Sequence, residues 1–355
     1  VKKIVRNSCF DCPAIIQLGF WPGGDRDGNP FVTAAITNDV ADELRMNLMK
    51  CYYQDVKQLA RKLTFKKVED VLENLRAGLY VAMFDPTKTM RYEEIMDPLA
   101  DIRAALLENY NSLYLDELDT LIDKVKIFRT HFATLDIRQN HGVHRQTIEA
   151  ILKQEKLIAN RLDELGKAEL LTILLNRDIV VQPDQFDDAI IKDTIATIAQ
   201  MAHIQRKNGT EGCNRYVISH AEDIFSVLFV FSLLRWCGWK KGELPVDIIP
   251  LFESMEGMKN AGSIMQELFD IPQYRAHIVQ RRDRQVIMLG FSDGTKHGGY
   301  LKANWSNNTT KEPHSAVCKE RGVQAKFFDG RGGPPARGGG KTHRFYASQG
   351  KNIAN

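Results

Sequence analysis

The sequence predicts a mainly helical α/β protein built on an incomplete (β/α)8 TIM-type barrel with many extra helices. Short apolar runs recur along the chain, each followed by small or charged residues, which is typical of buried strands in a parallel sheet. The segments between these runs carry apolar residues with helical spacing. A doubly wound open sheet is the alternative, but no G-x-G-x-x-G follows any of the runs.

The expected strands are the short apolar runs, taken in chain order. They lie at residues 15–20, 132–137, 216–219, 248–252, 286–291 and 325–328. The last three begin at similar intervals, each long enough for a strand, a loop and a helix. A closed barrel of this type has eight strands, so we expect two strands to lie outside this chain.

The expected helices are segments in which apolar residues recur every three or four positions. The most apolar of them, residues 224–234, contains Ser226 and Ser232 and is shorter than the roughly 20 apolar residues that cross a bilayer. We therefore expect it to be a buried core helix. The full set of expected helices covers residues 38–61, 92–127, 144–165, 186–206 and 221–237.

The composition is that of an ordinary globular protein. Lys and Arg number 48 against 45 Asp and Glu, a formal net charge of +3, which disfavours nucleic acid as the partner. The start of the chain lacks the apolar segment of a signal peptide, and the six cysteines lack a disulfide-framework spacing. We expect a cytoplasmic protein with no membrane segment.

Two carboxylates follow neighbouring expected strands. Glu253 comes directly after the fourth run and Asp293 after the fifth, with Lys296 three residues further on. In a parallel barrel these residues meet at the carboxyl ends of the strands, where two carboxylates can hold one Mg²⁺ or Mn²⁺ ion. The alternative is that either carboxylate merely caps the following helix.

A glycine-rich, arginine-containing stretch follows the last expected strand. Its glycines let the backbone approach an anion, and Arg331 and Arg337 offer forked donors for phosphate or carboxylate. Arg138, at the end of the second run, is expected at the same edge. A flexible RNA-binding tail is the alternative, which the directly preceding strand and the low net charge disfavour.

Other motifs in the sequence do not predict a functional site. The sequence at residues 340–342 imitates the end of a P-loop, but the first glycine is missing and no strand directly precedes it. Cys9 and Cys12 form a lone C-x-x-C without a second pair. No further ligand stands at metal-site spacing from His141 and His144, so we expect these to be surface or capping histidines.

Taken together, the strand-end motifs resemble the phosphoenolpyruvate carboxylase family. Five blocks occur in the family's order and span most of the chain. They are FWPGGDRDGNP at 20–30, TLDIRQ at 134–139, LFESMEGMKNA at 251–261, IMLGFSDGTKHGG at 287–299 and FDGRGGPPARGGGKTH at 328–343.

The resemblance implies a Mg²⁺-dependent carboxy-lyase that joins phosphoenolpyruvate and bicarbonate to give oxaloacetate and phosphate through carboxyphosphate and enolpyruvate. That reaction fixes carbon dioxide and supplies the tricarboxylic acid cycle. Family members are usually homotetramers. They are also longer than this chain, which lacks an initial Met. We therefore expect residues 1–355 to be the central part of one barrel domain, without the segment that holds the family's catalytic histidine and without the C-terminal segment.

The resemblance also assigns roles to residues. Glu253 and Asp293 match the family's divalent-metal ligands. Arg138, Arg331 and Arg337 match arginines that bind phosphoenolpyruvate and bicarbonate, the last two also acting in catalysis. The remaining matches are Lys296, a catalytic position in the signature block, and Arg26 and Asp27, which we expect to support the site.

Several positions depart from the family pattern. Asp329 stands where a histidine is usual before the first Gly-Arg-Gly-Gly, so the catalytic part of that position is open. His297 stands where aspartate is common, and Gly294 where serine is. Pro334 and Pro335 should stiffen the glycine-rich loop through their fixed φ. A non-catalytic metabolite-binding relative and another metal-dependent enzyme of phosphoenolpyruvate or pyruvate are therefore alternatives.

Overall fold

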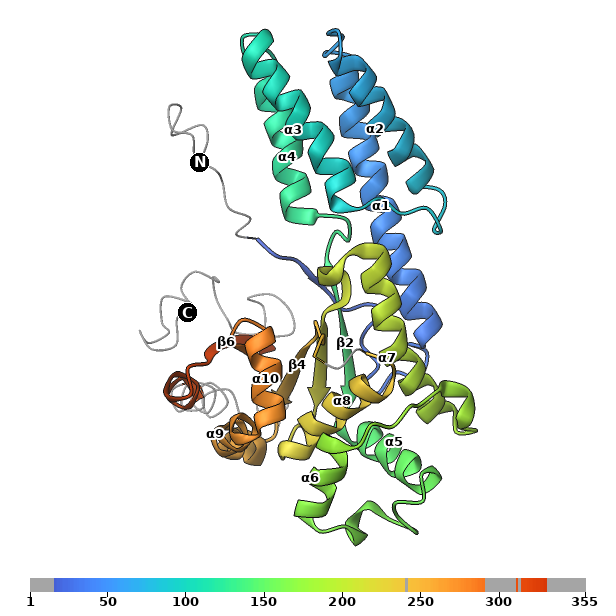
Figure 1. Cartoon of the computed structure of the whole chain (residues 1–355), viewed down its shortest axis with the longest axis vertical. Coiled ribbons are helices and arrows are strands. Elements are labelled where there is room, and N and C mark those ends of the chain that lie inside the picture. The colour runs from blue at the N-terminus through green and yellow to red at the C-terminus, as the bar shows by residue number, and fades with distance from the viewer. Residues whose placement is uncertain (1–15, 240–241, 291–310, 312–313, 331–355) are drawn as a thin grey trace. The chain divides into compact units, whose positions relative to one another are not determined.

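A computed structural model describes residues 16–239, 242–290, 311 and 314–330 (Figure 1). The chain divides into two compact units. The first comprises the described residues of Val1–Pro22, Asn38–Leu135 and His203–Cys213, and the second those of Gly23–Thr37, Asp136–Ala202 and Asn214–Asn355. Each unit is thus assembled from three separate stretches of chain, and three of the five boundaries fall within a helix or a strand.

The first unit is built on a bundle of helices with a continuous apolar core (Figure 1). Leucines at 72, 75 and 79 follow the three- and four-residue spacing that places side chains on one face of a helix. They are fully or almost fully buried, and apolar residues of the neighbouring helices complete the core. The helices are α1 (Ala34–Ala60), α2 (Val68–Ala82), α3 (Tyr92–Asn109) and α4 (Leu115–Phe128).

The helix expected over 92–127 is in fact two helices. Between α3 and α4, Asn111, Ser112 and Tyr114 have φ values of 49°, 61° and 60°. These left-handed residues cannot continue a right-handed helix, so the chain turns there. The prediction of one uninterrupted helix was wrong because its apolar periodicity continues in register on both sides of the turn.

The strands form a parallel sheet, as the sequence predicts. They are β1 (Gly19–Phe20), β2 (Thr134–Asn140), β3 (Arg215–Ser219), β4 (Asp247–Phe252), β5 (Arg284–Gly290) and β6 (Gln324–Gly330). The second strand lies slightly later than expected, and its last residues include Arg138.

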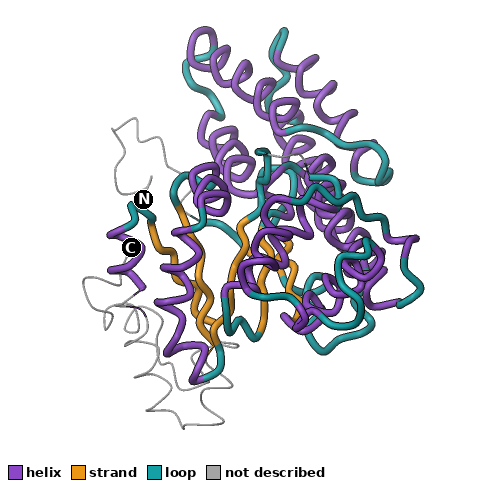
Figure 2. The backbone as a smooth tube through the Cα atoms, turned by 60° about the horizontal axis from the view of Figure 1, so that its bottom comes forward, coloured by secondary structure: helices purple, strands orange, loops and turns teal. Residues whose placement is uncertain are grey.

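The strands are hydrogen-bonded in sequence order, from β1 to β6, without a reversal. A doubly wound sheet reverses its order at a switch point, so the observed order is that of the barrel-type alternative. Figure 2 shows the strands side by side with helices against them. The described strands and helices form a mixed α/β fold that is compatible with an incomplete barrel.

Helices connect consecutive strands of the second unit. α8 (Ile224–Trp236) is buried almost throughout and packs against β4, which confirms the predicted core helix. The sequence did not predict three of the connecting helices, at residues 167–176, 255–270 and 272–280. Besides α8, the connecting helices are α5 (His141–Gln154), α6 (Lys167–Asn176), α7 (Ala189–Asn208), α9 (Met255–Asp270) and α10 (Pro272–Gln280). Short 3-10 turns lie at Leu162–Glu164, Pro183–Gln185 and Thr210–Cys213.

His144 is not the surface histidine that the sequence suggested. It is fully buried on α5, and its Nε2 lies 2.8 Å from the hydroxyl oxygen of Tyr216 on β3. His141, at the start of the same helix, stacks on Phe229 with ring centroids 5.8 Å apart. The prediction was wrong for His144 because the sequence around this polar residue does not indicate that a strand will cover it.

No helix in the described ranges is long and apolar enough to cross a membrane.

Burial makes His144 a determinant of acid stability. Desolvation lowers its pKa from 6.5 to about 3, so the folded state keeps it neutral while the unfolded chain takes up a proton below pH 6.5. Stability should therefore be complete above pH 6.5 and fall towards pH 3, by up to about 1.4 kcal/mol per pH unit from this residue. Urea unfolding of wild type and His144→Gln at pH 7 and 5 should show a smaller pH dependence in the variant.

His203→Gln is the matched control, because His203 is exposed on α7 and its removal should leave most of this pH dependence in place. A ring-proton NMR titration of His144 with a midpoint near pH 6.5 would contradict the assignment.

Candidate active site

The strand register places the candidate residues on one face and one edge of the sheet. Paired residues in a parallel sheet project to the same side, and successive residues alternate. Arg138 on β2 pairs with Val217 on β3, and Phe252 on β4 pairs with Leu289 on β5. Glu253 therefore lies level with Gly290, at the carboxyl ends of the strands, where parallel α/β barrels hold their chemistry.

Arg138 is fixed by a carboxylate from the loop after β1. Its Nε lies 2.7 Å from Asp25 Oδ1 and its Nη2 lies 2.9 Å from Oδ2, which is a bidentate pair. A backbone bridge joins the same two residues, and Asp27 Oδ2 lies 3.9 Å from Nη1. The loop after β1 thus sets the plane of the guanidinium.

Arg26 points away from this pair. It is 7 % exposed, and its guanidinium contacts Asp193 and Thr197 on α7. The other oxygen of Asp193 accepts a hydrogen bond from the backbone N–H of Ala34. Arg26 therefore ties the loop after β1 to α7.

Glu253 is almost completely buried, with 8 % of its surface exposed. Its Oε1 accepts a hydrogen bond of 3.0 Å from the backbone N–H of His220, and the ring Nδ1 of His220 lies 3.0 Å from the same oxygen. On the other side, a Cβ on Gly290 would come within 2.5 Å of the Glu253 Cβ. The carboxylate is therefore held between the ends of β3 and β5.

Asp329 does not join this group. It pairs with Leu289, one residue out of step with Glu253 and Gly290, so its side chain projects to the opposite face of the sheet. There its carboxylate lies 2.8 Å and 3.0 Å from the buried Lys311 Nζ. The structure thus brings Asp329 to the helix-covered side of β6, away from the strand-end residues.

The remaining predicted site residues lie outside the described part of the chain. They are Asp293, Lys296, Arg331 and Arg337. Within the described ranges, no group of three or more His, Cys, Asp or Glu side chains is arranged to hold a metal ion.

Sequence reasoning missed three contacts of the site: Asp25, His220 and Asn140. The Asn140 Nδ2 lies 3.5 Å from Asp27 Oδ1 and 3.4 Å from His220 Nδ1. The sequence signal that could have identified Asp25 is the alternation of residues in the GDRDG block. This alternation puts Asp25 and Asp27 on one side of the chain and Arg26 on the other. No sequence pattern connects His220 with Glu253, since their contact depends on the pairing of β3 with β4.

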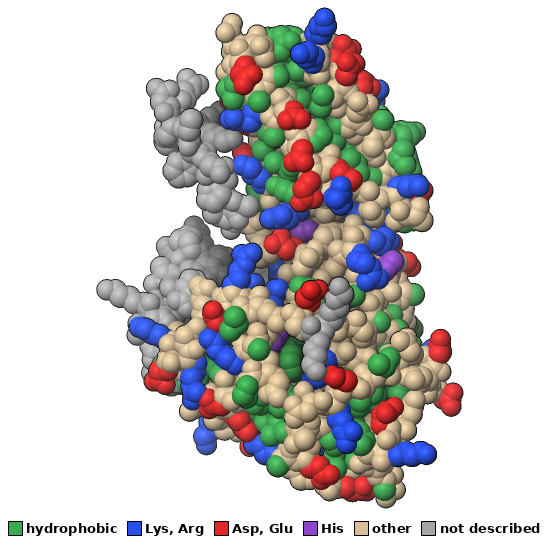
Figure 3. Space-filling model, in the orientation of Figure 1, with side chains coloured by type: hydrophobic (Ala, Val, Ile, Leu, Met, Phe, Trp, Pro, Cys, Tyr) green, Lys and Arg blue, Asp and Glu red, His purple; other side chains and the backbone are tan. Residues whose placement is uncertain are grey.

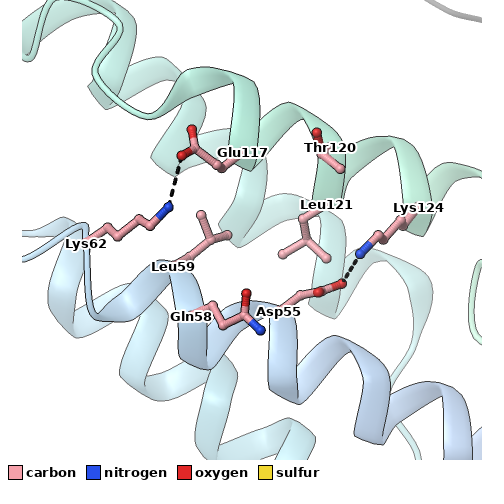
Figure 4. Close-up of a pocket in the computed structure, with 8 residues that line it drawn as sticks. All are labelled: Asp55, Gln58, Leu59, Lys62, Glu117, Thr120, Leu121 and Lys124. Atoms are coloured by element: carbon pink, nitrogen blue, oxygen red, sulfur yellow. Dashed lines mark hydrogen bonds and ion pairs between the residues drawn. The ribbon is translucent and has the colours of Figure 1, made fainter.

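A hollow of about 200 Å³ in the first unit contains none of these residues. Figure 4 shows it between α1 and α4, with Leu59 and Leu121 at its base and an ion pair at each end. Lys62 Nζ lies 3.1 Å from Glu117 Oε1, and the Lys124–Asp55 pair measures 2.7 Å. Because each lysine is already neutralised by a carboxylate, we place the candidate site at the strand ends.

The surface charge is mixed. On the face drawn in Figure 3, acidic and basic side chains are interspersed over the described residues of each unit, without an extended single-sign patch. This view offers no cationic face of the kind that duplex binding needs.

The fold and the site define a class: a parallel α/β protein with charged residues gathered at the carboxyl ends of its strands, as in barrel enzymes. Comparison with known families makes this specific. The phosphoenolpyruvate carboxylase family model matches residues 1–91 and 82–353. The chain belongs to the phosphoenolpyruvate carboxylase family.

Curated relatives agree with this assignment. Phosphoenolpyruvate carboxylases from Shewanella oneidensis and Nitrosomonas eutropha are 30% and 28% identical to the chain over 373 and 386 residues, each covering 95% of it. The enzyme from Gloeobacter violaceus is 27% identical over 392 residues and covers 94% of it. The chain spans 41% to 42% of the length of these relatives.

The close approach of β5 to Glu253 predicts that Gly290→Ala is destabilising. The added methyl would overlap Glu253 Cβ at 2.5 Å and Cα at 3.0 Å, so the strand end must shift, at a cost of about 1–3 kcal/mol. Urea unfolding measures the loss.

Gly262→Ala on α9 is the matched control, because a Cβ there meets nothing within 4 Å. It should leave stability unchanged or raise it by up to about 1 kcal/mol, as Gly→Ala does in a helix. Equal stabilities for the two variants would refute the close approach.

Proposed function

We propose that a protein containing this chain is a phosphoenolpyruvate carboxylase, a carboxy-lyase that converts phosphoenolpyruvate and bicarbonate to oxaloacetate and phosphate. The observation that carries the proposal is that an oriented Arg138 and a buried Glu253 both lie at the strand ends of a chain that belongs to this family. We also propose that it supplies oxaloacetate to the tricarboxylic acid cycle and that it acts in the cytoplasm.

Arg138 is suited to bind the phosphate of phosphoenolpyruvate. Burial works against its charge, but the hydrogen bonds that it donates to Asp25 and the charges of Asp25, Asp27 and Glu253 more than offset this and raise its pKa. A permanently charged, forked guanidinium matches phosphate geometry, and its charge can stabilise a phosphoryl group in transfer. We assign Arg331 and Arg337 to the same anions, and Lys296 to the same site.

We propose that a divalent cation binds at the strand ends, although the described residues by themselves include no group of three or more ligands arranged to hold one. The carboxylates of Asp25 and Asp27 lie beside the guanidinium of Arg138, and the charge of Glu253 also acts on it. Hard cations such as Mg²⁺ and Mn²⁺ prefer carboxylate oxygens. We assign Glu253, together with Asp293, as the ligands. The metal, when bound, supplies Lewis-acid stabilisation of a developing enolate oxygen.

We assign two further tasks to the protein's own residues, which are the positioning of Arg138 and the exclusion of water. Arg26 fixes the loop that carries Asp25 and Asp27, so it supports Arg138 without facing the same edge. The enolate must meet carbon dioxide before it meets a proton, so exclusion of water is required. We assign that task to the glycine-rich stretch after β6.

We further propose that residues 1–355 form the central part of one barrel domain and that the complete protein is a homotetramer. The unreversed strand order supports the first statement.

The ion pair of Asp329 with Lys311 favours a second candidate function, a relative that binds metabolites without catalysis, because it turns Asp329 away from the site.

The first test is oxaloacetate formation by the longest natural chain that contains this sequence, with phosphoenolpyruvate, bicarbonate and Mg²⁺. Turnover should require bicarbonate and should fall at least about 100-fold in Glu253→Gln, which keeps the size of the side chain but removes a negative ligand. Glu243→Gln is the control, because Glu243 lies in the loop before β4 and should leave turnover unchanged.

The outcomes separate the candidates. Turnover without bicarbonate would indicate a different enzyme of phosphoenolpyruvate or pyruvate. Phosphoenolpyruvate binding without turnover would indicate the non-catalytic relative. Full activity of Glu253→Gln would remove Glu253 from the metal site.

Asp25 should control substrate affinity through Arg138. Asp25→Asn keeps one acceptor but loses the charged bidentate partner, so the guanidinium is no longer held in one plane. The KM for phosphoenolpyruvate should rise about tenfold, corresponding to about 1.4 kcal/mol, with a smaller change in kcat.

Steady-state kinetics on the same natural chain measure this effect. Asp184→Asn is the matched control, since Asp184 is exposed and pairs with Lys192 on the surface. A KM that falls in Asp25→Asn would mean that Asp25 competes with the substrate for Arg138 and does not orient it.

A further inference from the structure

His220 contacts the buried carboxylate of Glu253 twice. Its backbone N–H donates to Oε1 at 3.0 Å, and its ring Nδ1 lies 3.0 Å from the same oxygen. The two side chains differ sharply in exposure, 52 % for His220 and 10 % for Glu253. An accessible imidazole therefore covers one oxygen of an otherwise enclosed acid.

The contact fixes where the imidazole proton lies. A lone pair on Nδ1 would repel a carboxylate oxygen at 3.0 Å, so Nδ1 must carry hydrogen and donate it to Oε1. Both the neutral Nδ1–H tautomer and the imidazolium meet this condition. Asn140 Nδ2 lies further from Nδ1, at 3.4 Å, and as a donor it cannot replace the carboxylate as the partner of an Nδ1–H group.

The backbone of His220 is held in an uncommon conformation. Its φ is 55°, in the left-handed region that residues with a Cβ rarely adopt and keep only where the surroundings impose it. His220 follows β3 directly, and β3 pairs in register with β4, which ends one residue before Glu253. This conformation turns both donors of His220 toward the same oxygen.

We propose that His220 is a positioning residue for a divalent cation bound by Glu253. By occupying Oε1 from two directions, while Gly290 packs against the Glu253 Cβ, it fixes the carboxylate plane and with it the direction of Oε2. Outer partners of this kind orient a metal ligand before the ion binds. The inference rests on the proposed assignment of Glu253 as a metal ligand.

The test measures Mn²⁺ binding by electron paramagnetic resonance, without turnover, in the longest natural chain. His220→Gly removes the ring but keeps the backbone donor, and glycine adopts φ near 55° without strain. The Mn²⁺ dissociation constant should rise about 10–100-fold, the usual effect of losing an outer partner. His220→Asn supplies a side-chain donor, tolerates the same φ and should restore part of the affinity.

Two controls make the result specific. The exposed His203→Ala on α7 should bind Mn²⁺ as wild type does. The thermal midpoints of both His220 variants are measured beside Mn²⁺ binding, so that a loss of affinity in a variant that stays folded at the assay temperature reports the metal site and not the fold.

Wild-type Mn²⁺ affinity in His220→Gly would overturn the proposal, as would an equal loss in His220→Gly and His220→Asn. Glu253→Gln separates this from failure of the proposed function. If Glu253→Gln abolishes Mn²⁺ binding while His220→Gly does not change it, only the role of His220 fails. If Glu253→Gln binds Mn²⁺ normally, the metal assignment fails and this inference with it.

Discussion

The parallel register of the strands is the constraint on which the site depends. Because β2, β3, β4 and β5 run in one direction and pair without a reversal, their carboxyl ends meet at one edge. Arg138, His220, Glu253 and Gly290 reach that edge from four different strand ends. A slip of one residue in any pair would turn the side chain concerned to the opposite face. Asp329, one residue out of step, illustrates this, since it faces Lys311 instead.

Buried charge is the second organising feature. A charge removed from water needs a partner, and here each partner also sets an orientation. Asp25 holds the fork of Arg138, Asp193 holds Arg26, and His220 holds one oxygen of Glu253. The network consequently prepares a guanidinium and a carboxylate at a strand edge rich in negative charge.

Much of the fold could be predicted because it depends on local patterns. Continuous apolar runs identified all six strands, and the apolar residues of 224–234 identified the core helix α8. Prediction failed where a tertiary contact or a local turn decided the outcome. The turn at Asn111 and Ser112 divides a periodic segment into α3 and α4, and the packing of β3 against α5 buries His144.

For the candidate site, motif resemblance singled out Arg138 and Glu253, and the structure brings both to the carboxyl edge of the sheet, with Arg138 charge-coupled to Glu253. The motif resemblance could not indicate that Asp25 orients Arg138 or that His220 covers Glu253, because the two members of each pair are far apart in the chain. The sequence alone determined the positions of the strands and the residue types at their ends, which follow from local composition and spacing, and its motifs indicated the family through resemblance; the pairing order of the strands came from the structure. Only the tertiary structure decided which side chains meet, because that depends on register, on the alternation of faces and on the left-handed turn at His220.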